Sequence, residues 1–115
     1  MAQAKFKGTM SVSETLVLIK NEIIKLGLTV ELVGESKHNF DDYFVYMLVY
    51  EKFYYRSSNR ASLSILISGN TEESTIDVIS SGAGQGVLFK FSWGADKNFV
   101  NGLRNILLKY NFREI

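Results

Sequence analysis

The chain contains no cysteine and no proline among its 115 residues. Without cysteine it can form no disulfide, no thiolate metal site and no thiolate nucleophile, which suits a reducing cytoplasm. An excess of one charge is also missing, because 13 Lys and Arg nearly balance 12 Asp and Glu for a formal net charge of +1. Such a weak field favours neither nucleic acid nor a membrane surface as a partner.

A long hydrophobic run is absent as well. The longest apolar and aromatic stretch, residues 43–50, is far shorter than the roughly 18 residues needed to span a bilayer. Residues 1–7 have no apolar core of the kind that a signal peptide requires. We therefore expect a single soluble, cytoplasmic domain over residues 1–115. A chain of this length buries roughly two-thirds of its unfolded surface without disulfides or metal.

No catalytic, cofactor or metal motif stands out. His38 is the only histidine and has no cysteine with which to share a transition metal. The glycine-rich segment 82–86 has neither the GxGxxG nor the GK[ST] pattern, and a strand-like segment follows it where a phosphate loop needs a helix. This segment is predicted to be a turn or bulge, in which Gln85 could present its amide to a ligand. The sequence thus predicts no cofactor, no metal and no catalytic residue.

The apolar pattern predicts two helices around a block of strands. Ser11 and Glu14 form a capping box, a 4-3-4-3 apolar stripe follows to Leu26, and Gly27 marks the helix end. A second amphipathic helix is expected over 99–110. Strands are expected at 4–9, 28–32, 43–55, 61–68, 75–80 and 87–92, with 34–42 as a polar connection. The order β-α-β(4–5)-α predicts an α+β fold, an antiparallel sheet with two helices on one face.

This element order resembles the half-repeat of the TATA-binding-protein fold and its helix-on-sheet relatives. Nucleic-acid binding by that fold needs a basic sheet face carrying apolar wedges. The face expected to be open here is tyrosine and serine with Lys52 as its single lysine, so we expect no nucleic-acid partner.

The aromatic segment 43–55 is the most informative part of the chain, since it holds five of the six tyrosines. A half-exposed strand alternates apolar and polar residues, but this segment is apolar at both parities until Glu51. Both faces of the strand therefore require cover, and one helix layer can cover only one of them. More of the chain, a partner copy or a ligand is left to cover the second face.

The hairpin around Asn59 decides which side chains face the helices. A three-residue loop at 57–59 places Arg56 opposite Arg60 and puts Glu51 on the helix side, while a loop of two or four residues exchanges the faces. With the three-residue loop, a buried Glu51 needs a cation, which favours an ion pair over a general acid or base. The opposite face then carries the aromatic residues Phe44, Tyr46, Tyr50 and Tyr54.

Two functions follow as hypotheses. The first is a non-enzymatic binding module that self-associates, as a homodimer, or holds a small apolar ligand on its aromatic sheet face. The alternative is a small enzyme with an acid–base pocket around Glu51 and Gln85. The candidate residues for binding a ligand or partner are Tyr46, Tyr50, Tyr54, Glu51, Arg60 and Gln85.

Four short segments resemble the signature stretches of a known family: YEKFYY (50–55), NRASL (59–63), ISSGAGQ (79–85) and FKF (89–91). The family consists of small single-domain bacterial proteins described only as a domain of unknown function. The resemblance runs from about Phe6 to Leu108. It implies a bacterial source and a stand-alone domain, and it brings no activity, cofactor or catalytic residue.

Overall fold

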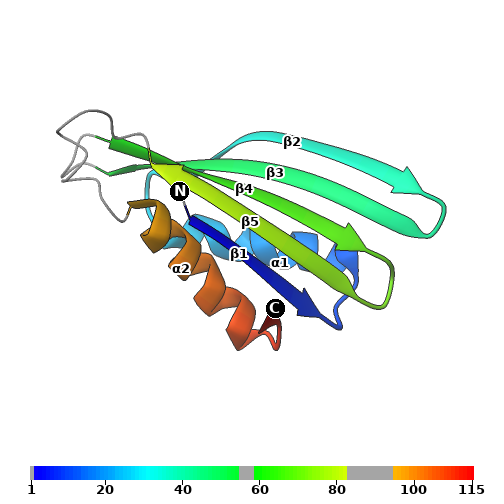
Figure 1. The fold of residues 1–115 in the computed structure, drawn as a ribbon. Coiled ribbons are helices and arrows are strands. Elements are labelled where there is room, and N and C mark those ends of the chain that lie inside the picture. The colour runs from blue at the N-terminus through cyan, green and yellow to red at the C-terminus, as the bar shows by residue number, and fades with distance from the viewer. Residues whose placement is uncertain (1, 55–58, 83–94) are drawn as a thin grey trace.

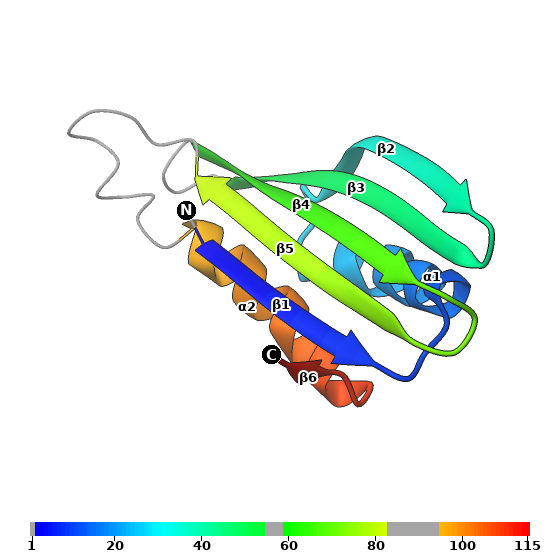
Figure 2. The same cartoon turned by 45° about the vertical axis from the view of Figure 1, so that its right-hand side comes forward.

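The computed structural model describes residues 2–54, 59–82 and 95–115, and it has the predicted α+β fold. Its six strands form one antiparallel sheet in the order β2-β3-β4-β5-β1-β6. Both helices pack on the same face of this sheet (Figures 1 and 2). The elements are β1 (Ala2–Gly8), α1 (Val12–Ile23), a 3-10 turn η1 (Ile24–Leu26), β2 (Glu31–Phe40), β3 (Tyr43–Tyr54), β4 (Asn59–Gly69), β5 (Ser74–Gly82), α2 (Ala95–Lys109) and β6 (Arg113–Glu114).

Helix α1 starts at the predicted capping box. The Glu14 amide donates to the Ser11 hydroxyl oxygen at 3.1 Å, and the Ser11 hydroxyl donates to the Glu14 carboxylate at 3.0 Å. The Ser11 cap is therefore confirmed. From this start α1 carries the chain under β4 and β3, from β1 near one edge of the sheet to β2 at the other (Figure 1).

The core lies between the two helices and the sheet. Side chains from every second position of β1, β3, β4 and β5 point into it, as the two-residue repeat of a strand requires. Helix α1 contributes Ile19 and Ile23, and α2 contributes Leu103 and Leu107, all fully buried. One pair of hydroxyls is buried with these apolar groups: Thr15 Oγ1 and Ser74 Oγ lie 2.8 Å apart.

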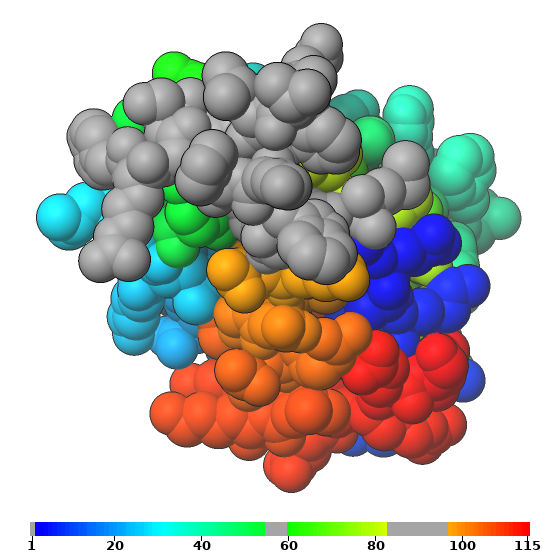
Figure 3. Space-filling model, turned by 60° about the vertical axis from the view of Figure 1, so that its left-hand side comes forward, coloured from blue at the N-terminus to red at the C-terminus, as the bar shows by residue number. Residues whose placement is uncertain are grey.

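The C-terminal residues close the β1 edge of the sheet. Phe112 is buried against Gly8, where a Cβ atom would overlap the Phe112 ring, so glycine is required for this close approach. The Arg104 guanidinium bonds both Glu114 oxygens, at 2.9 and 3.0 Å, and lowers the pKa of that carboxyl group. In Figure 3 the C-terminal end of the chain (red) lies beside α2 (orange) and β1 (dark blue).

The predicted pairing of β3 with β4 is wrong. Tyr54 pairs with Asn59, so four residues, 55–58, separate the strands where three were expected. Glu51 consequently lies opposite Ser62, on the face away from the helices. This is the alternative face assignment of the longer loop, and β4 keeps its predicted orientation. The side chains that turn toward the helix layer are Phe44, Tyr46, Tyr50 and Tyr54.

The prediction of a polar connection at 34–42 is also wrong, because most of that range forms β2. All ten residues of β2 are exposed, so neither face imposes an apolar alternation that the sequence could reveal. The predicted strand at 28–32 shares only residues 31–32 with β2, at the start of β2. The expected turn at 82–86 and strand at 87–92 fall outside the described residues, apart from Gly82 at the end of β5.

The strands extend well beyond the helix layer. Twelve helical residues in α1 span about 18 Å, whereas twelve residues of β3 span about 40 Å. Along β3, Leu48 and Tyr50 are buried under the helices, Tyr46 is half-buried and Tyr43 is exposed. The molecule is accordingly elongated, 47 × 25 × 23 Å. Within the part of the chain that the structure describes, no helix is long and apolar enough to cross a membrane.

Candidate functional site

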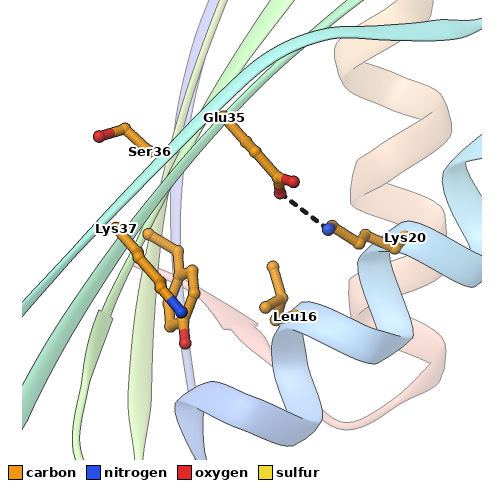
Figure 4. A pocket seen from close by; sticks show the side chains of 6 residues that line it. Leu16, Lys20, Glu35, Ser36 and Lys37 are labelled. Atoms are coloured by element: carbon orange, nitrogen blue, oxygen red, sulfur yellow. Dashed lines mark ion pairs between the residues drawn. The ribbon is translucent and has the colours of Figure 1, made fainter.

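A pocket of about 450 Å³ opens where the β2–β3 hairpin extends past α1 (Figure 4). We call it the α1–β2 groove. Its wall on the helix side is one face of α1, and its opposite wall is β2, which no helix covers along its length. The residues that line it are Leu16, Lys20, Glu35, Ser36, Lys37 and Tyr46.

Charged side chains form the rim of the groove. Lys20 Nζ lies 2.7 Å from Glu35 Oε2 and joins α1 to β2 across the opening (Figure 4). Lys37 extends from β2 on the same side as Glu35, while Ser36 points away from them. Among the described residues, Lys37 has no ion-pair or hydrogen-bond partner. Two ammonium groups and one carboxylate thus leave the rim with a positive charge.

The interior of the groove is apolar. Leu16 and Tyr46 are half-buried and pack against the edge of the core. Tyr50 lies deeper, only 2% exposed, and its pKa is raised by burial and then by the negative charge of Glu35. The groove therefore places an apolar floor directly beside its charged rim.

A second charged cluster lies on the sheet face away from the helices. Arg60 Nη1 is 3.3 Å from Glu51 Oε1, and the Arg60 guanidinium lies 5.6 Å from the centre of the Phe53 ring. The prediction that Glu51 pairs with a cation is confirmed. The prediction that Glu51 is buried is wrong, because its side chain is 37% exposed. The changed strand register explains the difference, since it turns Glu51 out of the core.

The tyrosines expected on an open face lie elsewhere. Tyr46 lines the α1–β2 groove, and Tyr50 belongs to the core. Tyr54 is half-buried on the helix side, with Lys52 Nζ 4.8 Å from its ring centre. Gln85 lies outside the described residues. The structure thus brings Glu51 and Arg60 together, but it contradicts an exposed face built from the three tyrosines.

Lys52, expected on the open face, instead connects β3 to the end of η1. Its ammonium donates to the Leu26 carbonyl at 2.8 Å, a position where a cation also complements the negative end of a helix. Burial lowers the pKa of Lys52. Next to it, a Cβ atom on Gly27 would overlap the Lys52 side chain. Lys52 therefore helps to hold the helix end against the sheet.

The charged residues of the groove were missed by sequence reasoning. Glu35 and Lys37 lie in the range 34–42, for which the sequence predicts a connection, so it assigns them to no face of the sheet. One signal was present, because Lys20 follows Leu16 by four residues and so lies on the same side of the predicted helix. An apolar stripe bordered by a lysine is too common on helices to indicate a binding site by itself.

Comparison with protein families gives a match over most of the chain. Residues 1–111 match the model of a family described as "Family of unknown function (DUF6054)", a range that includes all four signature segments. No curated protein matches the sequence. The crystal structure of TTHA0849 from Thermus thermophilus is similar over 96% of this chain and 99% of that chain, with 10% identity and a TM-score of 0.29. Such a distant likeness carries no argument about function.

Proposed function

This chain belongs to DUF6054, a family of unknown function, and we propose that it is a non-enzymatic module that binds a small amphipathic anion in the α1–β2 groove. The proposal follows from the surface of the protein itself. The observation that carries this proposal is the apolar floor beside a cationic rim, enclosed between α1 and β2. The absence of cysteine makes the cytoplasm the compartment that we propose for it.

The size and lining of the groove suit a small molecule. Ligand sites typically measure about 300–1,000 Å³ and combine an apolar surface with a few polar groups that orient the ligand. The groove, at about 450 Å³, lies in this range. Leu16 and the Tyr46 ring would contact the apolar body of the ligand, and the anionic group would lie toward the rim.

The charges on the rim favour an anion over a cation or a neutral molecule. The contact with Glu35 holds the Lys20 ammonium at the opening, and its remaining hydrogens can still bond a carboxylate, sulfonate or phosphate. Lys37 supplies a second charge. Both lysines are solvated, so each contributes on the order of 1 kcal/mol, and we expect dissociation constants in the micromolar to millimolar range.

The alternative function, an acid–base enzyme around Glu51 and Gln85, has no supporting geometry among the described residues. Glu51 lies on the other face of the sheet and pairs with Arg60. The groove itself contains no nucleophile activated by a neighbouring base. Binding is therefore the function that we put to the test.

The test uses ¹⁵N-labelled protein titrated with decanoate, an anion with an apolar chain. We expect saturable amide shifts at α1 residues near Leu16 and at β2 residues near Glu35, with weaker effects from decanol and from inorganic phosphate. Lys20→Gln removes one rim charge and leaves Glu35 unpaired, so decanoate should bind about tenfold more weakly. Lys7→Gln is the matched control, because Lys7 lies on the opposite face of the sheet and contacts Glu73.

Two results would overturn the proposal. Decanoate shifts spread over the open sheet face would place the binding site elsewhere. Equal affinities for Lys20→Gln and Lys7→Gln would show that the rim charges play no part.

A further inference from the structure

We propose that β2 is the interface with a second copy of this chain, in which two β2 strands pair antiparallel about a twofold axis at Ser36. The two sheets would then join into one, with all four helices on the same side. This proposal concerns the outer edge of β2 and does not rest on a ligand in the groove, although Glu35 and Lys37 belong both to this edge and to the rim of the groove.

Among the described residues, β2 is the long edge strand of the sheet. It spans ten residues, all exposed, and β3 is its hydrogen-bonded neighbour in the described chain (Figure 1). The opposite edge is β6, which has only two residues. A long edge strand presents a row of unpaired N–H and C=O groups, and pairing with a second chain satisfies them. Of the two edges, β2 offers the length that such an interface needs.

The charges of β2 complement their own copy. With the axis at Ser36, Glu35 lies directly opposite Lys37 of the second copy, and Lys37 lies opposite the second Glu35. Both side chains point to the helix side, as their pairing with Leu48 and Tyr46 shows. A twofold interface uses each contact twice, so this register makes two cross-strand ion pairs.

The neighbouring registers are disfavoured by the same two residues. An axis at Glu35 brings the two glutamates face to face, and an axis at Lys37 does the same for the lysines. Like charges directly opposite each other on paired strands are destabilising. The pattern therefore selects one register.

Charges and bulges also occur on edges that proteins protect from pairing. Here the bulge lies between Leu32 and Gly34, beyond the central stretch 34–38, which keeps a regular register with β3. A protective edge repels a second copy with charges of one sign. The alternation of Glu35 and Lys37 does the opposite, because each charge meets its complement.

The experiment measures the mass of ligand-free protein by light scattering at millimolar concentration. One chain has a mass of 13.0 kDa, and we expect twice that value. Glu35→Lys and Lys37→Glu each place like charges opposite one another, so each variant alone should associate at least about tenfold more weakly. Lys7→Glu, a charge change on the open face, is the control and should leave the mass of the dimer unchanged.

Mixing the two variants gives the decisive result. Lysines at 35 and 37 in one variant meet glutamates at 37 and 35 in the other, so an equimolar mixture should form a heterodimer. Native mass spectrometry with one variant ¹⁵N-labelled identifies it, and a misfolded variant could not be rescued in this way. A monomeric wild type, or a dimer that both single variants leave intact, would overturn the proposal. Lys20→Gln should bind decanoate weakly yet still dimerise, which separates this proposal from the proposed function.

Discussion

Replacing Thr15 by valine should destabilise the protein out of proportion to the atoms removed. Thr15 Oγ1 donates to the Ser11 carbonyl at 2.8 Å. Since this uses its single hydroxyl hydrogen, Ser74 must be the donor in the 2.8 Å bond between the two hydroxyls. Thr15 and Ser74 are 0% and 1% exposed. Valine keeps the shape of threonine but leaves the Ser74 hydroxyl buried without its acceptor.

The two single variants should lose different amounts of stability, because only Thr15→Val leaves a buried donor without an acceptor. A buried donor without a partner costs about 1–3 kcal/mol, so Thr15→Val should lower the free energy of unfolding by that amount. Ser74→Ala should cost about 1 kcal/mol, because Thr15 keeps its bond to Ser11. In the double variant the unsatisfied donor is gone, and the total should fall short of the sum by about 1 kcal/mol.

Urea unfolding of the wild type and the three variants measures this cycle, with unchanged slopes as the check on two-state behaviour. Thermal midpoints should drop by a few degrees for each kcal/mol. Additive costs, or a Thr15→Val variant as stable as the wild type, would refute the assignment of Ser74 as donor to Thr15.

Other predictions concern the helix start, the open face, a turn and the core. Ser11→Ala should cost about 1 kcal/mol in urea unfolding through loss of the cap, and an unchanged midpoint would contradict it. Glu51→Gln should change stability by less than about 1 kcal/mol, since its ion pair is solvated; a larger loss would indicate a structural role. Gly69→Ala should cost more than about 2 kcal/mol, because Gly69 has φ 153° and a Cβ would overlap the Glu73 carbonyl; a folded variant of wild-type stability would rule this out. Burial raises the pKa of Tyr50, which means that the folded state favours the neutral phenol. The resulting stabilisation is fully present below the ordinary tyrosine pKa of about 10 and is lost as pH rises through the raised value. Tyr50→Phe should therefore flatten the alkaline fall in unfolding free energy, and an identical pH profile would contradict the assignment.

The sequence predicted the features that rest on strong periodicity. The first helix, its Ser11 cap and the inward side chains of β4 were all derived from apolar spacing and capping chemistry, and the structure agrees. The face of β3 could not be derived in the same way. Its residues are apolar at both parities, so the assignment depended on the length of the connection at 55–58, which no local pattern specifies.

The groove could be predicted only in part. Leu16 lies on the apolar stripe predicted for the first helix, because burial leaves a periodic signal there. Tyr46 lies in a segment that is apolar at both parities, so it is recognised as an aromatic residue but expected on the open face. Glu35 and Lys37 belong to a strand exposed on both faces, where solvent accepts any polar sequence and no signal arises. For a site between a buried and a solvated element, the sequence therefore predicts only the residues of the buried element.

The full exposure of β2 has a consequence for how the family can diverge. Substitutions at solvated positions usually change stability by less than about 0.5 kcal/mol, whereas changes in the core cost several times more. One wall of the groove is thus built from residues whose replacement costs little folding stability, while the floor beneath it is constrained by folding. Relatives can therefore change ligand preference along β2 without loss of folding stability, but a changed charge at position 35 or 37 would also weaken the proposed dimer.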